Sequence, residues 1–218
     1  IKDILLNKNS LVNGIDNLPN VKGLYNNSSK TSTDVILSAT YTDITKNELM
    51  LTNKFYSLDN SYNSDNMVKV SKLYSYGNNQ MVTEETYNAF IKMFNAAKKE
   101  DLTLIINSSF RSYEEQEELC ESYASLYGQS YVDRYVAMPG FSEHQTGFAF
   151  DIGSTTSNVF ANSKEFAWIV DNAHKYGFIQ RFPKGQEDIT GFRYESWHYR
   201  YVGKDIAKYI YENKMTYD

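Results

Sequence analysis

Residues 142–151 read SEHQTGFAFD, a polar loop that runs into a short strand pattern. We predict a strand over residues 147–152, along which side chains alternate between two faces. Asp151 then shares its face with Gly147 and Ala149, two positions with almost no side chain. A carboxylate on an apolar strand is costly to bury without a partner. The stretch therefore predicts a metal site with Asp151 as one ligand.

Two further segments complete this predicted site. His144 lies seven residues before Asp151, so the loop between them must fold back to bring both side chains to one ion. In the sequence Glu195-Ser196-Trp197-His198, a histidine three residues after a glutamate places a ligand near a base. Catalytic zinc commonly takes three protein ligands and lowers the pKa of its water to about 7, so that a carboxylate can remove a proton. We therefore predict that His144, Asp151 and His198 bind zinc, and that Glu195 is the catalytic base.

The segment SSFRSYEEQ, residues 108–116, adds a cation. Arg111 lies directly before Ser112, whose spacing to Glu115 forms a capping box that predicts the start of a helix. Free N–H groups at a helix start favour anions, so we expect Arg111 to stabilise an oxyanion or to bind the terminal carboxylate of a peptide. Gln116, one turn into the helix, is expected to hydrogen-bond the substrate.

Patterns of helix and strand alternate irregularly around these segments. They are, in order, a helix after Thr83, a strand over 102–106, a helix after Ser112, the strand over 147–152, a helix opened by Asn162 and Glu165 that ends near Gly177, a strand over 197–202 and a helix with Ile206 and Ile210. Because no regular β-α-β repeat is present, we predict an α+β fold.

The composition is that of an ordinary globular protein of 218 residues, with 41% hydrophobic and 22% charged residues. A net charge of −5 argues against nucleic acid as a partner. No apolar run reaches the roughly 18 residues that a membrane helix needs. The single cysteine, Cys120, excludes an internal disulfide and a cysteine-based zinc finger, and we expect it to be buried on a helix.

The first part of the chain differs from the rest. Residues 1–47 are rich in polar, turn-prone stretches, so we predict an N-terminal arm or linker there and one domain over residues 48–218. The chain opens without an initiator methionine or a secretory signal. We interpret it as a mature or trimmed form that lacks any targeting segment the full protein carries.

Four segments carry a family resemblance: SSFRSYEEQ, PGFSEHQTGFAFD, NAHKYGFIQRFPKGQEDITG and YESWHYRYVG. In order and spacing they resemble the VanY/LdcB group of D-alanyl-D-alanine and L,D-carboxypeptidases, whose metal centre is similar to that of lysostaphin-type peptidases and hedgehog domains. The resemblance spans roughly residues 48–203. It implies a zinc-dependent α+β fold with a central antiparallel sheet flanked by helices. It also implies removal of the C-terminal D-alanine from peptidoglycan stem peptides at the extracellular face of the bacterial envelope.

Carried over by position, the metal ligands of the group fall on His144, Asp151 and His198, and its base falls on Glu195. The substrate-contact positions fall on Arg111, Gln116 and Ser142. The group commonly has glycine where Ser109 stands and an aliphatic residue where Phe150 stands. Ser109 is near Arg111, so this departure leaves the pose of the substrate open.

Two other residues, His174 and Arg200, have a structural interpretation. His174 is expected to be a packed, hydrogen-bonded helix residue outside the metal site. Arg200 shares a strand face with His198, and is interpreted either as supporting that ligand or as forming a structural ion pair.

Several functions stay open at this point. A D,D-carboxypeptidase is favoured over an L,D-carboxypeptidase acting on tetrapeptide stems, and an endopeptidase would use the same metal centre. A non-catalytic wall-binding module is the alternative of a different class, although a pure binder has no need of Glu195 and Arg111. We expect a monomer.

Overall fold

The computed structural model describes residues 40–77 and 79–218. Most of the predicted arm over residues 1–47 therefore lies outside the described residues, and the domain boundary at residue 48 stays a prediction. None of the helices within the described ranges is long and apolar enough to cross a bilayer.

Helices and short strands are interspersed along the described chain, as the sequence patterns predict. The elements are β1 (Thr40–Tyr41), η1 (Ile44–Leu49), β2 (Tyr56–Ser57), β3 (Met67–Lys69), β4 (Met81–Thr83), α5 (Glu84–Lys98), β5 (Leu104–Ser108), α6 (Tyr113–Tyr127), α7 (Gln129–Tyr135), η2 (Glu143–Thr146), β6 (Ala149–Ser154), η3 (Phe160–Asn162), α8 (Lys164–Asn172), η4 (Ala173–Tyr176), β7 (Phe178–Phe182), α9 (Glu187–Thr190), β8 (Glu195–Tyr201) and α10 (Lys204–Asn213), where η marks 3₁₀ helices.

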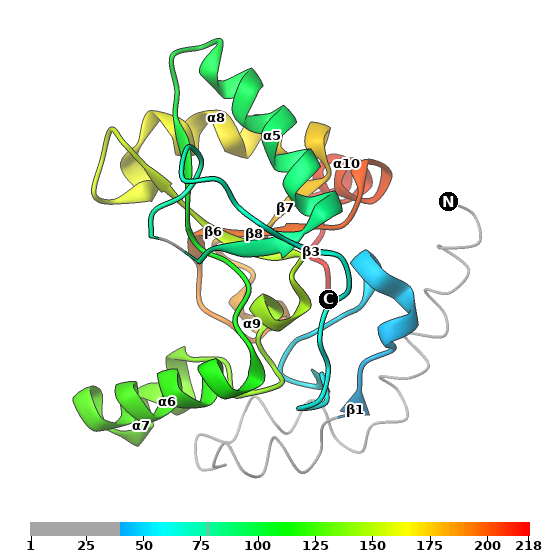
Figure 1. The fold of residues 1–218 in the computed structure, drawn as a ribbon, viewed down its shortest axis with the longest axis vertical. Helices are drawn as coiled ribbons and strands as arrows, with labels where there is room; N and C mark the ends of the chain where they lie inside the picture. The colour runs from blue at the N-terminus through cyan, green and yellow to red at the C-terminus, as the bar shows by residue number, and fades with distance from the viewer. Residues whose placement is uncertain (1–39, 78) are drawn as a thin grey trace. The chain divides into compact units, whose positions relative to one another are not determined.

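A four-stranded antiparallel sheet in the order β5-β6-β8-β7 lies at the centre of the fold. Figure 1 shows α5 and α8 above these strands and the α6–α7 hairpin below them. Two small sheets, β1-β2 and β3-β4, accompany it. The predicted α+β class with a central antiparallel sheet is thus confirmed.

The two faces of the central sheet have different chemistry because side chains alternate along each strand. Phe150 of β6 pairs with Tyr199 of β8, and both belong to the main core. The ring of Phe150 lies 5.4 Å from that of Phe90 on α5, which seals this face with apolar surface. The next pair, Asp151 with His198, points to the opposite face. The apolar packing of one face thereby fixes the position of two polar side chains on the other.

Local signals for helix starts are confirmed at two sites and wrong at a third. Thr83 caps α5, and Ser112 and Glu115 form the predicted capping box of α6. The cap of α8 is Ser163, whose hydroxyl accepts a hydrogen bond from the N–H of Phe166, and not the predicted Asn162.

The predicted strand over residues 147–152 is displaced. β6 starts at Ala149, and Gly147 ends η2 in the left-handed region, with φ of 71°. A Cβ atom at this glycine would lie 2.7 Å from Sδ of Met67. Gly147 therefore makes the turn between η2 and β6, and it does not share the strand face of Asp151.

Candidate active site

The three predicted metal ligands lie together on the polar side of the sheet. Their nearest nitrogen and oxygen atoms are all within 4.8 Å of one another. His144 Nε2 is 3.5 Å from Oδ1 of Asp151, and His198 Nδ1 is 3.1 Å from the same oxygen. Three segments far apart in the sequence, η2, β6 and β8, thus bring two imidazoles and one carboxylate to one point.

The orientation of His144 is set from outside this cluster. Its Nδ1 lies 2.7 Å from the backbone carbonyl of Ser109, at the end of β5. A carbonyl can only accept, so Nδ1 carries the proton and the lone pair of Nε2 faces Asp151. Burial lowers the pKa of His144, which favours the neutral imidazole that a metal requires.

The orientation of His198 is set by Glu143, a residue that no sequence motif marks as functional. Nε2 of His198 lies 3.2 Å from the carboxylate of Glu143, and this leaves Nδ1 directed at Asp151. A carboxylate behind a ligating histidine is a common arrangement in metal sites, since it holds the ring and makes it a better donor.

Glu143 is held in turn by two fully buried guanidinium groups. Nε of Arg181 lies 2.8 Å and Nη1 of Arg200 lies 3.2 Å from Oε1 of Glu143. Burial alone would raise the pKa of Glu143, but the two arginines hold it well below its usual range. Arg181 also bonds both carboxylate oxygens of Asp218. Arg200 therefore forms a structural ion pair and also supports His198, because its ion-pair partner is the carboxylate behind that ligand.

A usable signal for this network exists in the sequence. Arg181 stands in the otherwise largely apolar segment Phe178-Ile179-Gln180-Arg181-Phe182, where a charge needs a buried partner. The partner could not be identified there, since Glu143 is 38 residues away in the sequence.

The ionisation of the cluster fits a divalent metal. Burial would raise the pKa of Asp151, yet His144 and His198 hold it well below its usual range, so the carboxylate is ionised. Although burial alone would lower the pKa of His198, Asp151 and Glu143 raise it to about 9. A metal ion must therefore displace a proton from His198. Two imidazole nitrogens and one carboxylate form a donor set that suits zinc.

A cleft of about 170 Å³ opens over the three ligands and also contains Arg111 and Glu195. The carboxylate of Glu195 lies 4.0 Å from Nδ1 of His198. Burial raises the pKa of Glu195, which makes this carboxylate a stronger base. The guanidinium of Arg111 is fixed by a 2.6 Å bond to Oε1 of Gln116 and a 3.1 Å bond to Oγ of Ser108.

The two other predicted substrate contacts, Gln116 and Ser142, also line this cleft. Gln116 accepts from Arg111 and donates to the carbonyl of Ala137 at 2.6 Å, so both ends of its amide are engaged in orienting the cation. Ser142 caps η2 through a 3.4 Å bond from the N–H of His144. Direct contact of either residue with a substrate stays a prediction.

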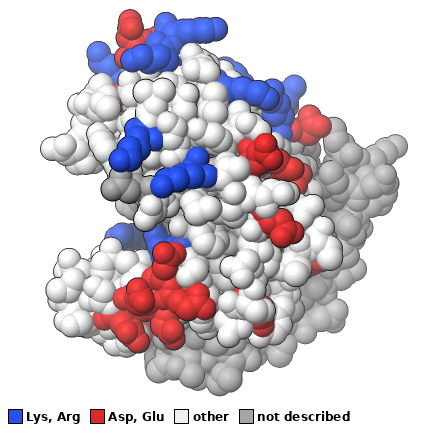
Figure 2. Space-filling view, in the orientation of Figure 1, with Lys and Arg blue, Asp and Glu red and all other residues white. Residues whose placement is uncertain are grey.

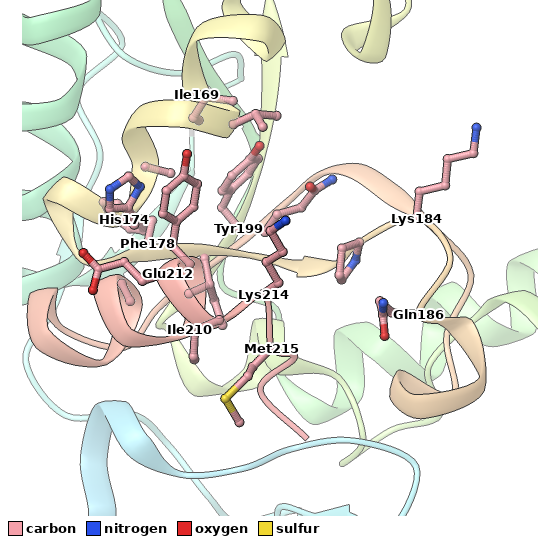
Figure 3. A pocket seen from close by; sticks show the side chains of 17 residues that line it. Ile169, His174, Phe178, Lys184, Gln186, Tyr199, Ile210, Glu212, Lys214 and Met215 are labelled. Carbon is pink, nitrogen blue, oxygen red and sulfur yellow. The ribbon is translucent and has the colours of Figure 1, made fainter. Parts of the chain in front are cut away.

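His174 lies apart from the cluster, as expected. It lines a separate pocket of about 500 Å³ between η4, β7 and α10, shown in Figure 3. Its ring stacks on Tyr211 with centroids 3.7 Å apart. Within residues 40–77 and 79–218, Nδ1 of His174 has no hydrogen-bond partner, so the predicted hydrogen bond is wrong at that atom while the packing is confirmed.

Comparison with known proteins gives relatives whose descriptions name a carboxypeptidase. A family model described as VanY, D-alanyl-D-alanine carboxypeptidase, matches residues 79–204. The chain is 41% identical over 179 residues to "Putative carboxypeptidase YodJ" of Bacillus subtilis (strain 168), covering 78% of this chain and 66% of that protein. It spans about half to two thirds of the length of the curated relatives that it matches.

Solved structures agree with this result. The LdcB LD-carboxypeptidase matches with a TM-score of 0.75 and 38% identity, covering 83% of this chain and 88% of that one. A vancomycin-resistance D,D-pentapeptidase VanY, solved in complex with Zn(II), matches with a TM-score of 0.68 and 28% identity, covering 78% and 96%. Because the family model covers more than half of the 218 residues, this chain belongs to the VanY family of D-alanyl-D-alanine carboxypeptidases, as its sequence motifs predict.

Proposed function

We propose that this chain is a zinc-dependent carboxypeptidase that removes the C-terminal D-alanine from peptidoglycan stem peptides, with D-alanyl-D-alanine as the preferred end. One observation carries the proposal: a single cleft holds two imidazoles and a carboxylate within 4.8 Å of one another, a buried glutamate and a fixed guanidinium. The Zn(II) complex of the similar D,D-pentapeptidase supports the choice of metal.

In this proposal His144, Asp151 and His198 hold the zinc ion. When bound, zinc would act as a Lewis acid on the scissile carbonyl and make a water molecule acidic enough to lose a proton near neutral pH. Glu195 takes that proton as the water oxygen adds to the carbonyl of the penultimate residue. It then gives the proton to the nitrogen of the terminal D-alanine as the C–N bond breaks. The products are free D-alanine and a stem that is one residue shorter.

In this proposal Arg111 binds the terminal carboxylate of the substrate. A guanidinium binds a carboxylate through two parallel hydrogen bonds, and Gln116 and Ser108 hold this one in place. Such a contact requires a free C-terminus. The proposal therefore favours removal of a terminal residue over cleavage within a peptide.

An L,D-carboxypeptidase that acts on tetrapeptide stems is the second candidate. The match to the LdcB LD-carboxypeptidase, with its TM-score of 0.75, favours it. Both reactions release D-alanine, and they differ in the configuration of the residue before the scissile bond. The substrate also places the proposed activity at the cell envelope, outside the cytoplasmic membrane. We propose a monomer as the active unit, since all the assigned residues come from one chain.

The test is release of D-alanine from synthetic stems by zinc-loaded protein. A pentapeptide ending in D-Ala-D-Ala should yield D-alanine, a chelator should stop the release, and added zinc should restore it. Release from the tetrapeptide alone would make the L,D activity the correct one. Release from neither stem would refute both candidates.

A further inference from the structure

Four tyrosines form a continuous row of rings on the α6–α7 hairpin. They are Tyr123 and Tyr127 of α6, and Tyr131 and Tyr135 of α7. The ring centroids of Tyr123 and Tyr127 are 5.9 Å apart, those of Tyr127 and Tyr131 are 4.8 Å apart, and those of Tyr131 and Tyr135 are 4.9 Å apart. We call this set the tyrosine row.

The row lies at the surface. Tyr127 is 62% exposed and the neighbouring Leu126 is 67% exposed, while the other three tyrosines are half-buried. Within the described residues, none of the four hydroxyls has a hydrogen-bond partner. A partly exposed run of aromatic rings leaves contiguous apolar surface in water, and such surface often marks a binding site.

The tyrosine row is continuous with the cleft. Tyr123 and Tyr135 line the cleft together with the predicted ligands, and the guanidinium of Arg193 lies 5.0 Å above the ring of Tyr135. Tyr123 and Tyr127 follow Gln116 at spacings of seven and eleven residues, so all three lie on one face of α6.

The opposite face of α6 is acidic. Its exposed glutamates are Glu114, Glu117, Glu118 and Glu121. Figure 2 shows acidic side chains gathered over the hairpin. The exposed acidic face of this helix is thus separate from the face that carries the rings.

The length of a stem peptide matches this arrangement. When the last bond of a pentapeptide lies at the metal, four residues separate that bond from the sugar, and they span at most about 14 Å when extended. Along α6, Tyr123 is about 10 Å and Tyr127 about 17 Å from Gln116, at 1.5 Å per residue. A stem that leaves the cleft along α6 therefore passes Tyr123, which lines the cleft, and the sugar attached to it extends from there toward Tyr127.

We propose that the tyrosine row binds the glycan strand to which the stem peptide is attached. This inference rests on the proposed carboxypeptidase function and names the second part of its substrate. One face of a pyranose ring presents C–H groups of slight positive charge, which pack on the negative face of an aromatic ring. Tyrosine hydroxyls can hydrogen-bond the hydroxyl and N-acetyl groups of the sugar, and tyrosine loses little conformational entropy on binding. The preferred substrate is then a stem still joined to its glycan.

The test compares two substrates with the zinc-loaded protein: a free stem pentapeptide, and the same pentapeptide on a GlcNAc–MurNAc disaccharide. For the wild type we expect kcat/KM to be on the order of tenfold higher for the disaccharide form, mainly through a lower KM. The variants Tyr127→Ala and Tyr127→Ala/Tyr131→Ala should bring the ratio of the two kcat/KM values close to one. Tyr127→Phe keeps the ring and should keep most of the preference. Tyr76→Ala is the matched control, because Tyr76 is 56% exposed and lies outside the row.

A second measurement is independent of turnover. Metal-free protein is titrated with peptide-free glycan strands, and the tyrosine ring signals are followed by NMR; the wild type should show saturable shifts that the double variant lacks. An equal kcat/KM for both substrates in the wild type, or an unchanged ratio in the double variant, would overturn the proposal. A change of oligomeric state in Tyr127→Ala without a change in the ratio would also overturn it, and would make the row a contact between copies. If the wild type releases no D-alanine from either substrate, the proposed function fails. The NMR titration of the metal-free protein then still tests whether the tyrosine row binds glycan.

Discussion

Replacement of Glu143 by glutamine tests how the buried charges behind the metal ligands contribute to stability and to metal binding. The side chain of Glu143 is 1% exposed, and it bonds Arg181, Arg200 and His198. Glutamine keeps the size and one accepting oxygen but removes the negative charge. Asp218 then remains as the carboxylate partner of Arg181, while Arg200 keeps the backbone carbonyls of Glu48 and Met50.

The magnitude follows from the burial of both guanidinium groups. Breaking a buried ion pair from one side costs about 3–5 kcal/mol, because the other charge stays buried without its partner. The loss of unfolding free energy should lie near the lower end of this range for Glu143→Gln and near the upper end for Glu143→Ala. For a domain of this size, 1 kcal/mol corresponds to roughly 2–4 °C, so Tm should fall by roughly 6–20 °C. Loss of the carboxylate behind His198 should also weaken zinc binding by about 10- to 100-fold.

The assay is urea denaturation of the metal-free protein, followed by zinc competition with a chelator of known affinity. Glu121→Gln is the matched control, since Glu121 is exposed on α6, and its effect on stability should stay within about 0.5 kcal/mol. A loss of less than about 1 kcal/mol in Glu143→Gln, with unchanged zinc affinity, would refute the reasoning.

Three more predictions concern other parts of the chain. Arg111→Lys should lower kcat/KM about 10- to 100-fold on a stem with a free C-terminus, and should reduce the preference of the wild type for that stem over its C-terminal amide, because lysine keeps the charge but loses the paired hydrogen bonds; an undiminished preference would rule out the assigned carboxylate contact. Burial would raise the pKa of Glu165, but hydroxyl hydrogen bonds from Thr156 and Ser154 lower it overall, so its contribution to stability is present above pH of about 4.3 and is lost as the pH falls through the folded value. The free energy of unfolding, measured by urea denaturation, should therefore fall less between pH 7 and pH 3.5 in Glu165→Gln than in the wild type. An equal fall in both proteins would contradict this. Burial raises the pKa of the Cys120 thiol, so iodoacetamide at neutral pH should modify the native protein far more slowly than the urea-unfolded protein, and equal rates would contradict the buried position.

The elements that could be predicted from the sequence are those with local signals. Thr83 and the Ser112–Glu115 capping box each mark a helix start within four residues. His144, Asp151 and His198 could be found because each stands in a short motif whose residue types suit zinc. A local signal also misleads when a neighbour competes for the same role, as Ser163 does with Asn162 at the start of α8.

Contacts between residues far apart in the sequence could not be predicted from such local signals. Strand β7 was not predicted, although it forms an edge of the central sheet, because its apolar run follows directly on a helix and shows no alternation. The support of His198 by Glu143 and the arginines depends on pairs 38 to 57 residues apart. Such contacts follow from strand register and burial, which only the folded chain defines.

Zinc content and D-alanine release, measured in the same samples, test the central claim most directly. Metal-free wild-type protein, titrated with zinc and assayed on the stem pentapeptide, should gain activity in proportion to bound zinc up to one equivalent per chain. Asp151→Ala should bind zinc weakly and release little D-alanine, whereas Glu195→Ala should bind one equivalent and release almost none. Undiminished release by the metal-free protein, or by Glu195→Ala, would contradict the account.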